Sequence, residues 1–324
     1  MSIGVVLMTY GAPQGDADLP RYLAAVRGGQ PADDALIAEM RRRYGLIGGS
    51  PLVRITCAQA SALQTMLGEG YLARSGMRFS DPSIGDAARD LAACGATHLT
   101  GVVLSPQWSP FLMDGYARAL QSAAEEVGVA WSVAAAWHRE PAFVESLAEL
   151  VHEAEPGDAA IIFTAHSLPR RVFENEPEYV ALLRETAELV ARRVPLASGG
   201  WRWAYQSAGH TQEEWLRPDL KELFPEIVAT GAREILVVPV QFLSDHLEVL
   251  YDLDVAAAEE ARAAGLRYRR IAMPNARPSF IRALAAIAAS ATPASARATS
   301  PRPATCAPNP PVRTSSGHGP RSRP

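Results

Sequence analysis

The sequence predicts an α/β protein built of two similar open α/β lobes, each a four-stranded parallel sheet flanked by helices, with an active-site cleft between the lobes. Short apolar, β-branched runs alternate with longer segments of helical period through most of the chain, which is the pattern of β-α-β units. With 324 residues the chain is also long for a single core, and this length favours two domains that share a cleft.

Eight strands are expected, four on either side of residue 145. They lie near 3–9, 71–75, 98–104, 129–135, 158–165, 201–206, 234–240 and 267–272. Helix-forming composition and amphipathic spacing predict helices over 33–44, 52–68, 110–127, 140–153, 176–193, 217–229 and 246–264. Ligands of open parallel sheets bind outside the carboxyl ends of the strands, so residues that follow the strands are the candidates for chemistry.

The expected domains are an N-terminal lobe over 1–145 and a C-terminal lobe over 146–276. A helix over 277–289 is a candidate to join the N-terminal lobe. Residues 290–324 are predicted to be a disordered tail, because residues 291–324 hold eight prolines, five arginines and no acidic residue.

Composition limits the partners. The formal net charge of −4 and the sequence pI near 6.0 give no reason to expect a nucleic-acid partner, so small molecules are expected. The N-terminal apolar run is too short for a signal peptide or a membrane span, so no membrane insertion and a cytoplasmic location are expected. The three cysteines are far apart without a C-x-x-C motif, which indicates no thiolate metal site.

His166 is the first candidate for chemistry, because it follows the apolar run 159–165 and so lies where a buried strand enters the cleft. A neutral imidazole there accepts protons near pH 7 or binds a borderline metal ion such as Fe²⁺. The alternative is a structural histidine bonded to a nearby loop. Position alone leaves both readings open.

Glu248 is the second candidate. Asp245 and Glu248 match a capping box that opens a helix at 246, and capping alone would explain both residues. At about 100° per residue, however, Glu248, Asp252 and Glu259 form one acidic stripe, which offers oxygen ligands to a cation or relays protons. A solvated helix face is the alternative for Glu259 and Glu260.

Other polar residues are placed near the same cleft. Tyr10 ends the first strand, and its phenol there would pack on a planar ligand or approach its metal. Arg27 and Arg43 end predicted helices, where arginine usually complements the helix dipole. If the ligand carries carboxylates, these arginines and the Ser50 hydroxyl become anchors. Nucleotide-binding and α/β-hydrolase motifs are absent.

Six motifs in order resemble those of the ferrochelatases, and specifically the coproporphyrin-type enzymes of bacteria. They cover about residues 3–288, and as a set they are highly specific. The motifs are M-T-Y-G-A-P at 8–13, R-R-Y-G-L-I-G-G-S-P-L at 42–52, T-A-H-S-L-P at 164–169, Q-S-A-G-H-T-x-x-x-W-L-x-P at 206–218, V-P-V-Q-F-L-S-D-H-L-E-V-L-Y-D at 238–252 and M-P-N-A-R-P at 273–278.

The resemblance implies two Rossmann-like lobes of the chelatase type. It also implies insertion of Fe²⁺ into coproporphyrin III with release of two protons, in haem biosynthesis. His166 would be the pyrrole base or metal ligand and Glu248 its partner across the pocket, with Asp252 as a relay. Tyr10 would lie close to the iron of the product as an axial ligand. The residues implied to hold propionates or line the porphyrin pocket are Arg27, Arg43, Ser50 and Tyr116.

The chain departs from the family pattern at several points. An acidic residue common in relatives is replaced by Ala256, and Glu259 or Glu260 is a candidate substitute. Arg78-Phe79 stands where some relatives have a lysine-histidine pair, so no metal role is carried over there. Some relatives bind a [2Fe-2S] cluster through four cysteines; with three cysteines in total, no cluster and no permanently bound cofactor are expected.

A monomer is expected, with transient contact to the next haem-pathway enzyme. The alternative functions are a chelatase for protoporphyrin IX with Fe²⁺ or for sirohydrochlorin with Co²⁺, and a non-catalytic porphyrin or haem carrier. A carrier does not need both His166 and Glu248, so the intact pair favours catalysis.

Overall fold

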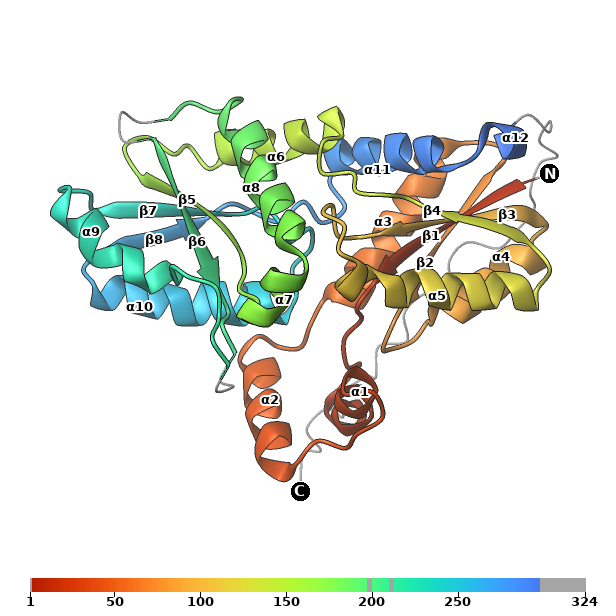
Figure 1. Cartoon of the computed structure of the whole chain (residues 1–324), viewed down its shortest axis with the longest axis horizontal. Helices are drawn as coiled ribbons and strands as arrows, with labels where there is room; N and C mark the ends of the chain where they lie inside the picture. The colour runs from red at the N-terminus through yellow and green to blue at the C-terminus, as the bar shows by residue number, and fades with distance from the viewer. Residues whose placement is uncertain (1, 197–199, 210–212, 298–324) are drawn as a thin grey trace, which may run out of the picture.

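The computed structural model describes residues 2–196, 200–209 and 213–297, and these residues form two four-stranded parallel sheets flanked by helices (Figure 1). The fold class predicted from the sequence is therefore confirmed. The first sheet has the order β2-β1-β3-β4, formed by Tyr71–Met77, Ser2–Thr9, Ala96–Val103 and Ala130–Val133. The second has the order β6-β5-β7-β8, formed by Trp201–Gln206, Ala160–His166, Glu234–Pro239 and Arg267–Arg270.

Strand β1 shows why the first sheet forms. All eight of its residues are buried, as is typical of a parallel sheet covered on both faces. Val5 and Leu7 pack on the side of α3 (Leu52–Leu67) and α11 (Pro278–Ala291). Val6 and Met8 pack on the other side, against α4 (Ile84–Ala93) and α5 (Pro110–Glu126). Successive side chains of a strand point to opposite faces, so this apolar run is matched to two layers of helices.

Strand β5 is placed in the same way in the second sheet. Phe163 belongs to the core formed with α6 (Pro141–Glu153) and α8 (Pro177–Ala191). Its neighbour Ile162 packs on the opposite side, where the helices are η2 (Leu220–Leu223), α9 (Phe224–Ala229), η3 (Glu248–Ala257) and α10 (Ala258–Ala263).

Helices α6 and α11 connect the two sheets. They pack against each other and lie side by side at the top of Figure 1. The rings of Phe143 and Phe280 meet between them with centroids 6.4 Å apart, inside one apolar core that reaches from β1 to β5. The expected division of the chain at 145/146 falls within α6, and it stays a prediction. The helix predicted over 277–289 is α11, which also packs on α3.

Several local elements differ from the expectation. Helix α4 was missed, although Ser83 and Asp86 form a capping box at its start. The helices α1 (Leu19–Val26) and α7 (Arg170–Asn175) were not predicted either, while α2 (Asp34–Leu46) was. The segment predicted as one helix over 217–229 is a short 3₁₀ turn followed by α9.

The prediction of disorder from residue 290 onward is wrong for 290–297. Helix α11 continues to Ala291, and α12 covers Ala294–Arg297. Thr292 is buried, and its hydroxyl lies 2.9 Å from that of Thr100 on β3, which holds this end of the chain on the first sheet. The remaining predicted tail, 298–324, lies outside the described residues.

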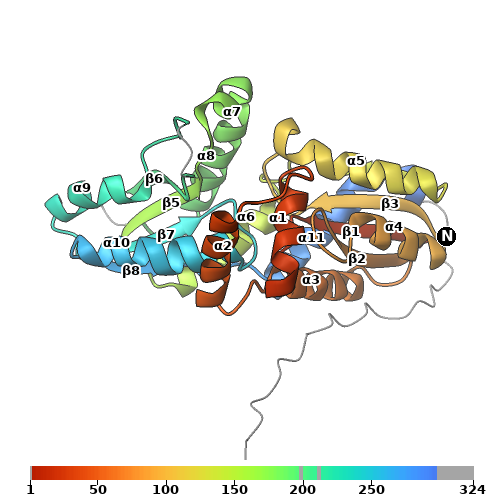
Figure 2. The ribbon, with the colours of Figure 1, turned by 90° about the horizontal axis from the view of Figure 1, so that it is seen from below.

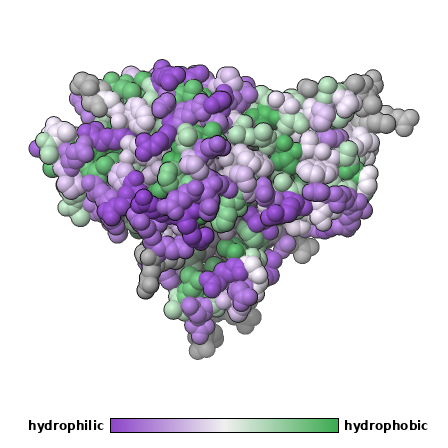
Figure 3. All heavy atoms as spheres, in the orientation of Figure 1, coloured by the Kyte–Doolittle hydropathy of each residue, from purple (hydrophilic) through white to green (hydrophobic). Residues whose placement is uncertain are grey.

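The two lobes lie next to each other, with α7 and α8 of the second facing α5 of the first (Figure 2). On the face seen in Figure 3, apolar residues are interspersed among hydrophilic ones. Among the described residues, no helix is both long and apolar enough to cross a membrane.

Candidate active site

His166 is the last residue of β5, as predicted, and its ring is fixed from one side. Its Nδ1 atom lies 2.5 Å from the carbonyl oxygen of Ser167. A carbonyl only accepts, so Nδ1 carries the proton and Nε2 of the neutral ring keeps its lone pair. The backbone N–H of His166 donates to Oε1 of Gln241 at 2.9 Å, and Nε2 of Gln241 donates to the hydroxyl of Tyr179 at 2.8 Å.

Glu248 faces that free lone pair. Its Oε1 lies 3.8 Å from Nε2 of His166, and both side chains are only partly exposed. The separation is too long for a hydrogen bond, so both groups keep lone pairs free for a third species. Glu248 begins the π-helix η3 and lies two residues after the half-buried His246, whose pKa is lowered by burial.

The predicted capping box at the start of this helix is wrong. The helix begins at Glu248, with Leu247 as N-cap and no capping side chain. Asp245 instead pairs with Asn275: the Asn275 side-chain amide donates to Oδ2 of Asp245 at 2.8 Å, and the Asp245 N–H donates to Oδ1 of Asn275 at 2.9 Å. Arg270 also donates to Asp245 at 3.2 Å. The carboxylate of Glu248 therefore takes no part in a capping box, and it faces His166.

The predicted acidic stripe also changes, because η3 is a π-helix. In a π-helix each N–H bonds five residues back, so the rotation per residue is smaller than the 100° that aligned Glu248, Asp252 and Glu259. Glu259 and Glu260 lie beyond it, exposed on α10, and Oε1 of Glu260 pairs with Nζ of Lys221 at 3.3 Å. The spacing argument for Glu259 is therefore wrong.

Asp252 lies one turn after Glu248. Burial raises the pKa of its carboxyl, and the charge of Glu248 adds to the rise, while the Ser207 hydroxyl and the positive charge of Arg43 oppose it. Nη1 of Arg43 on α2 lies 3.9 Å from Oδ1 of Asp252. The carboxyl of Asp252 thus keeps its proton to a higher pH than an exposed carboxyl does.

Tyr10 follows β1 in the first lobe and reaches the same region. Its side chain is 42% exposed, and its ring meets that of Phe79 edge-on with centroids 4.6 Å apart. Burial, reinforced by the negative charge of Glu248, raises the pKa of Tyr10 to about 12, against an opposing effect of Arg78. The phenol is therefore neutral near pH 7, and it shares an electrostatic environment with Glu248 of the other lobe.

The predicted porphyrin-binding residues are not all brought to one place. Tyr116 is buried on α5 under the guanidinium of Arg78. Arg43 is half-buried and paired with Glu39 at 2.7 Å, as well as lying near Asp252. Arg27 is exposed at the C-cap of α1. A propionate at Arg43 would therefore share the guanidinium with carboxylates of the protein.

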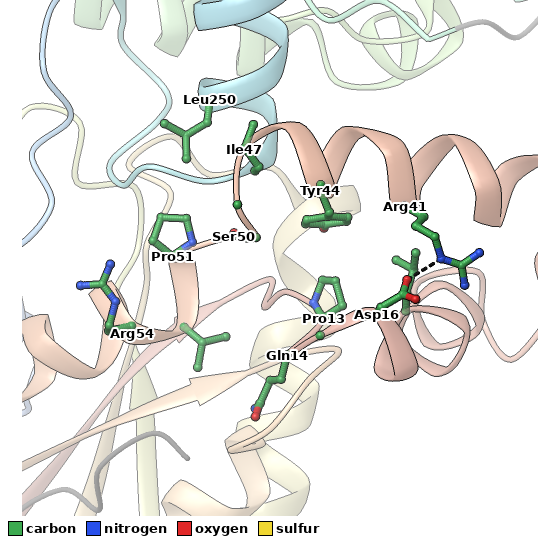
Figure 4. Close-up of a pocket in the computed structure, with 16 residues that line it drawn as sticks. Pro13, Gln14, Asp16, Arg41, Tyr44, Ile47, Ser50, Pro51, Arg54 and Leu250 are labelled. Atoms are coloured by element: carbon green, nitrogen blue, oxygen red, sulfur yellow. Dashed lines mark hydrogen bonds and ion pairs between the residues drawn. The ribbon is translucent and has the colours of Figure 1, made fainter. Parts of the chain in front are cut away.

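Ser50 lines a separate cavity of about 880 Å³ with Tyr44, Arg54 and Leu250 (Figure 4). Neither His166 nor Glu248 lines it. Leu250 belongs to η3, so this cavity lies against the same helix as Glu248 but is not shared with its carboxylate. The structure therefore does not bring Ser50 together with the histidine-glutamate pair.

Sequence reasoning assigned no role to two residues of the site. Gln241 holds the backbone of His166, and it was visible only as part of the V-P-V-Q-F motif. Arg78 lies beside Tyr10 and Tyr116, and it was considered only for a metal role. Over the described ranges, no group of three or more His, Cys, Asp or Glu side chains is arranged to hold a metal ion.

The arrangement of two four-stranded parallel sheets is the fold of solved chelatases. SirB from Bacillus subtilis, solved with Fe³⁺, superposes with a TM-score of 0.55 at 13% identity, over 90% of this chain and 97% of that chain. CbiX, the terminal enzyme of siroheme biosynthesis in denitrifying bacteria, gives 0.52 at 13% identity, over 90% of this chain and 100% of that chain. At such identities the likeness is one of fold.

The family follows from sequence. The Ferrochelatase family model matches residues 2–292. The ferrochelatase of Deinococcus radiodurans is 35% identical over 88% of this chain and 94% of its own. The coproporphyrin III ferrochelatases of Geobacillus sp. (strain WCH70) and Listeria innocua are 34% and 33% identical, over 88% and 87% of this chain and 96% of each relative. The chain belongs to the ferrochelatase family, so it is a metal chelatase of haem biosynthesis that acts on a porphyrin and a metal ion.

Proposed function

We propose that this chain inserts Fe²⁺ into coproporphyrin III, giving Fe-coproporphyrin and two protons. The observation that carries the proposal is the position of His166 Nε2, which bears a free lone pair 3.8 Å from Oε1 of Glu248. Metalation needs a base for the two pyrrole protons and an oxygen ligand that replaces water on the ion. His166 and Glu248 supply these two groups at one point of the cleft.

Each residue has a role in this proposal. Nε2 of His166 accepts a pyrrole proton, and the Ser167 carbonyl stabilises the imidazolium that results. Glu248 takes the ion or receives the second proton. Asp252, whose pKa is raised by burial, passes protons toward Arg43 and the surface. Tyr10 approaches the iron of the product from the other lobe. The planar macrocycle must also bend to expose its nitrogen lone pairs, and binding energy from the rest of the pocket supplies that strain.

Coproporphyrin III is the proposed porphyrin because of its four carboxylates and the names of the relatives. Two of the relatives compared above are named coproporphyrin III ferrochelatase. The arginines expected to anchor carboxylates, Arg27 and Arg43, lie on α1 and α2, and guanidinium groups bind carboxylates through paired hydrogen bonds. We further propose that the protein acts as a cytoplasmic monomer without a permanently bound cofactor or [2Fe-2S] cluster, and that it contacts the next haem-pathway enzyme transiently.

The test is anaerobic addition of Fe²⁺ to the purified protein with either coproporphyrin III or protoporphyrin IX, followed by the loss of porphyrin fluorescence. Faster metalation of coproporphyrin III is expected. Faster metalation of protoporphyrin IX would assign the chain to that substrate instead. Binding of both porphyrins without metalation of either would show a carrier and overturn the proposed reaction.

A further inference from the structure

Arg78 lies at the carboxyl end of β2, beside Tyr10. Its N–H donates to the Thr9 carbonyl at 2.9 Å, and the N–H of Phe79 donates to the Tyr10 carbonyl at 3.1 Å, so the two segments continue side by side past their strands. Arg78 is therefore located just past the end of β2, at the same end of the sheet as Tyr10.

The guanidinium of Arg78 is held in one position by α5. Its Cζ atom lies 5.2 Å from the ring centre of Tyr116 and 4.8 Å from that of Phe79, and Nη1 donates to the Leu112 carbonyl at 3.3 Å. Gly115 makes room for it, since a Cβ atom at that position would lie 2.1 Å from Nη2. Aromatic faces and a carbonyl orient the cation but do not neutralise it.

The guanidinium of Arg78 has no carboxylate partner among the residues that the structure describes. Arg78 is half-buried, and within 2–196, 200–209 and 213–297 no Asp or Glu oxygen lies within 4.0 Å of its guanidinium. Arg74, on the same strand, is by contrast paired with Asp90 at 2.6 Å. A partly desolvated charge without a counter-ion is unfavourable, and an anion that enters the cleft offsets that cost.

We infer that Arg78 binds a carboxylate of the tetrapyrrole substrate, next to the Tyr116 ring on which its guanidinium is stacked. The inference rests on the proposed function for the identity of the substrate, and it adds one anchor to those expected from the sequence. Arg27 is exposed and Arg43 already pairs with Glu39, so Arg78 is the arginine of the first lobe with an oriented and unneutralised guanidinium facing Tyr10.

The test compares binding of coproporphyrin III with binding of its tetramethyl ester, a neutral porphyrin, in a non-ionic detergent and without iron. Arg78→Met removes the charge but keeps an unbranched apolar stem. Its affinity for coproporphyrin III is expected to fall by about 10- to 100-fold at low ionic strength, the range for a charge-assisted hydrogen bond. The loss should shrink with added salt. Affinity for the ester should stay unchanged, which also shows that the variant is folded.

Two further variants complete the design. Arg118→Met removes one charge from an exposed position of α5 and should leave both affinities unchanged. Gly115→Ala leaves the charge of Arg78 in place and introduces a good helix former, but its Cβ atom would push the guanidinium off its site. This variant should therefore bind coproporphyrin III more weakly and the ester unchanged. Gly115→Ala also provides the test if Arg78→Met does not fold.

Equal affinity of the wild type and Arg78→Met for coproporphyrin III would overturn this inference while leaving the proposed function in place, provided that the wild type metalates this porphyrin. An equal loss for acid and ester would assign Arg78 to packing and would also overturn it. A wild type that binds neither porphyrin would refute both the inference and the proposed function.

Discussion

Nε2 of His166 and Oε1 of Glu248 lie 3.8 Å apart, and the two residues reach this separation from different elements of the second lobe, the end of β5 and the start of η3. The Ser167 carbonyl accepts a hydrogen bond from the other ring nitrogen of His166. Asp245, the residue expected to cap the helix, is instead hydrogen-bonded to Asn275. Both functional groups are thus left without a hydrogen bond to each other. This separation is the observation on which the proposed roles of the two residues rest.

Replacement of His166 by alanine should reduce metalation by at least about 100-fold, the lower range for removal of a general base, while porphyrin binding is retained. Fluorescence of the bound porphyrin measures binding, and its loss on anaerobic Fe²⁺ addition measures metalation. Glu248→Gln keeps the size of the side chain and should slow metalation as well. Unchanged metalation in His166→Ala would rule out the role proposed for the imidazole.

Asp252→Asn should make the protein more stable but less active. Because burial raises the pKa of this carboxyl, the folded protein binds its proton more tightly than the unfolded chain does. Ionisation therefore costs stability above the ordinary pKa of about 3.9, and the cost is fully present once the pH exceeds the raised value. The variant should melt about 2 °C higher at pH 7, where ~1 kcal/mol gives a shift of this size. Metalation at limiting Fe²⁺ should be slower.

The control for Asp252→Asn is the pH dependence of its melting temperature. The advantage over the wild type should disappear as the pH approaches 4, because the wild-type carboxyl is then protonated. A variant that is less stable at every pH would show that the ion pair with Arg43 outweighs the burial cost.

Protonation of His98 should make the protein less stable in acid. This residue is buried on β3 with Nε2 2.9 Å from the Ser132 hydroxyl, and burial lowers its pKa. The unfolded chain then binds the proton more tightly, so stability is complete above about pH 6.5 and falls as the pH decreases below it. In His98→Phe this fall should be smaller, whatever constant cost the substitution brings. Urea unfolding between pH 5 and 8 measures the slope, and equal slopes would contradict the prediction.

Glu176 joins the two lobes at the start of α5. Its Oε1 accepts the N–H of Phe111 at 2.7 Å, and its Oε2 accepts the hydroxyl of Ser109, the N-cap of that helix. Phe111 itself is 61% exposed, so the carboxylate and not apolar packing makes this contact. Glu176→Gln should lower the melting temperature by roughly 2–4 °C, corresponding to about 1 kcal/mol for a charge-assisted bond of a half-buried group.

Glu174→Gln is the matched control for Glu176→Gln. Glu174 lies on the same segment, α7, and forms an exposed ion pair with Arg170 at 3.3 Å. Exposed ion pairs contribute little to stability, so this variant should melt within about 1 °C of the wild type. Equal effects of the two substitutions would show that the contact with α5 contributes nothing specific.

The strands and their covering helices could be read from the chain because their signals are local. Ile161–Phe163 and Ile235–Val238 are apolar runs that only a buried parallel sheet accommodates, and His166 and Tyr10 follow such runs directly. The capping box of α4 at Ser83 and Asp86 was equally local, and the helix was missed because it lies close after β2.

The sequence by itself determined the two parallel sheets, the placement of His166 and Tyr10 at strand ends and, through its motifs, the ferrochelatase family, because hydrophobic period and short motifs are properties of neighbouring residues. Only the tertiary structure decided that Asp245 pairs with Asn275 and not with its own helix, that the helix starting at Glu248 is a π-helix and that Ser50 faces another cavity. It also decided that, in the part of the chain that the structure describes, no carboxylate pairs with Arg78, whose guanidinium lies over Tyr116. These outcomes depend on groups distant in the chain that compete for the same hydrogen bonds and charges, and no local pattern encodes which of them meet.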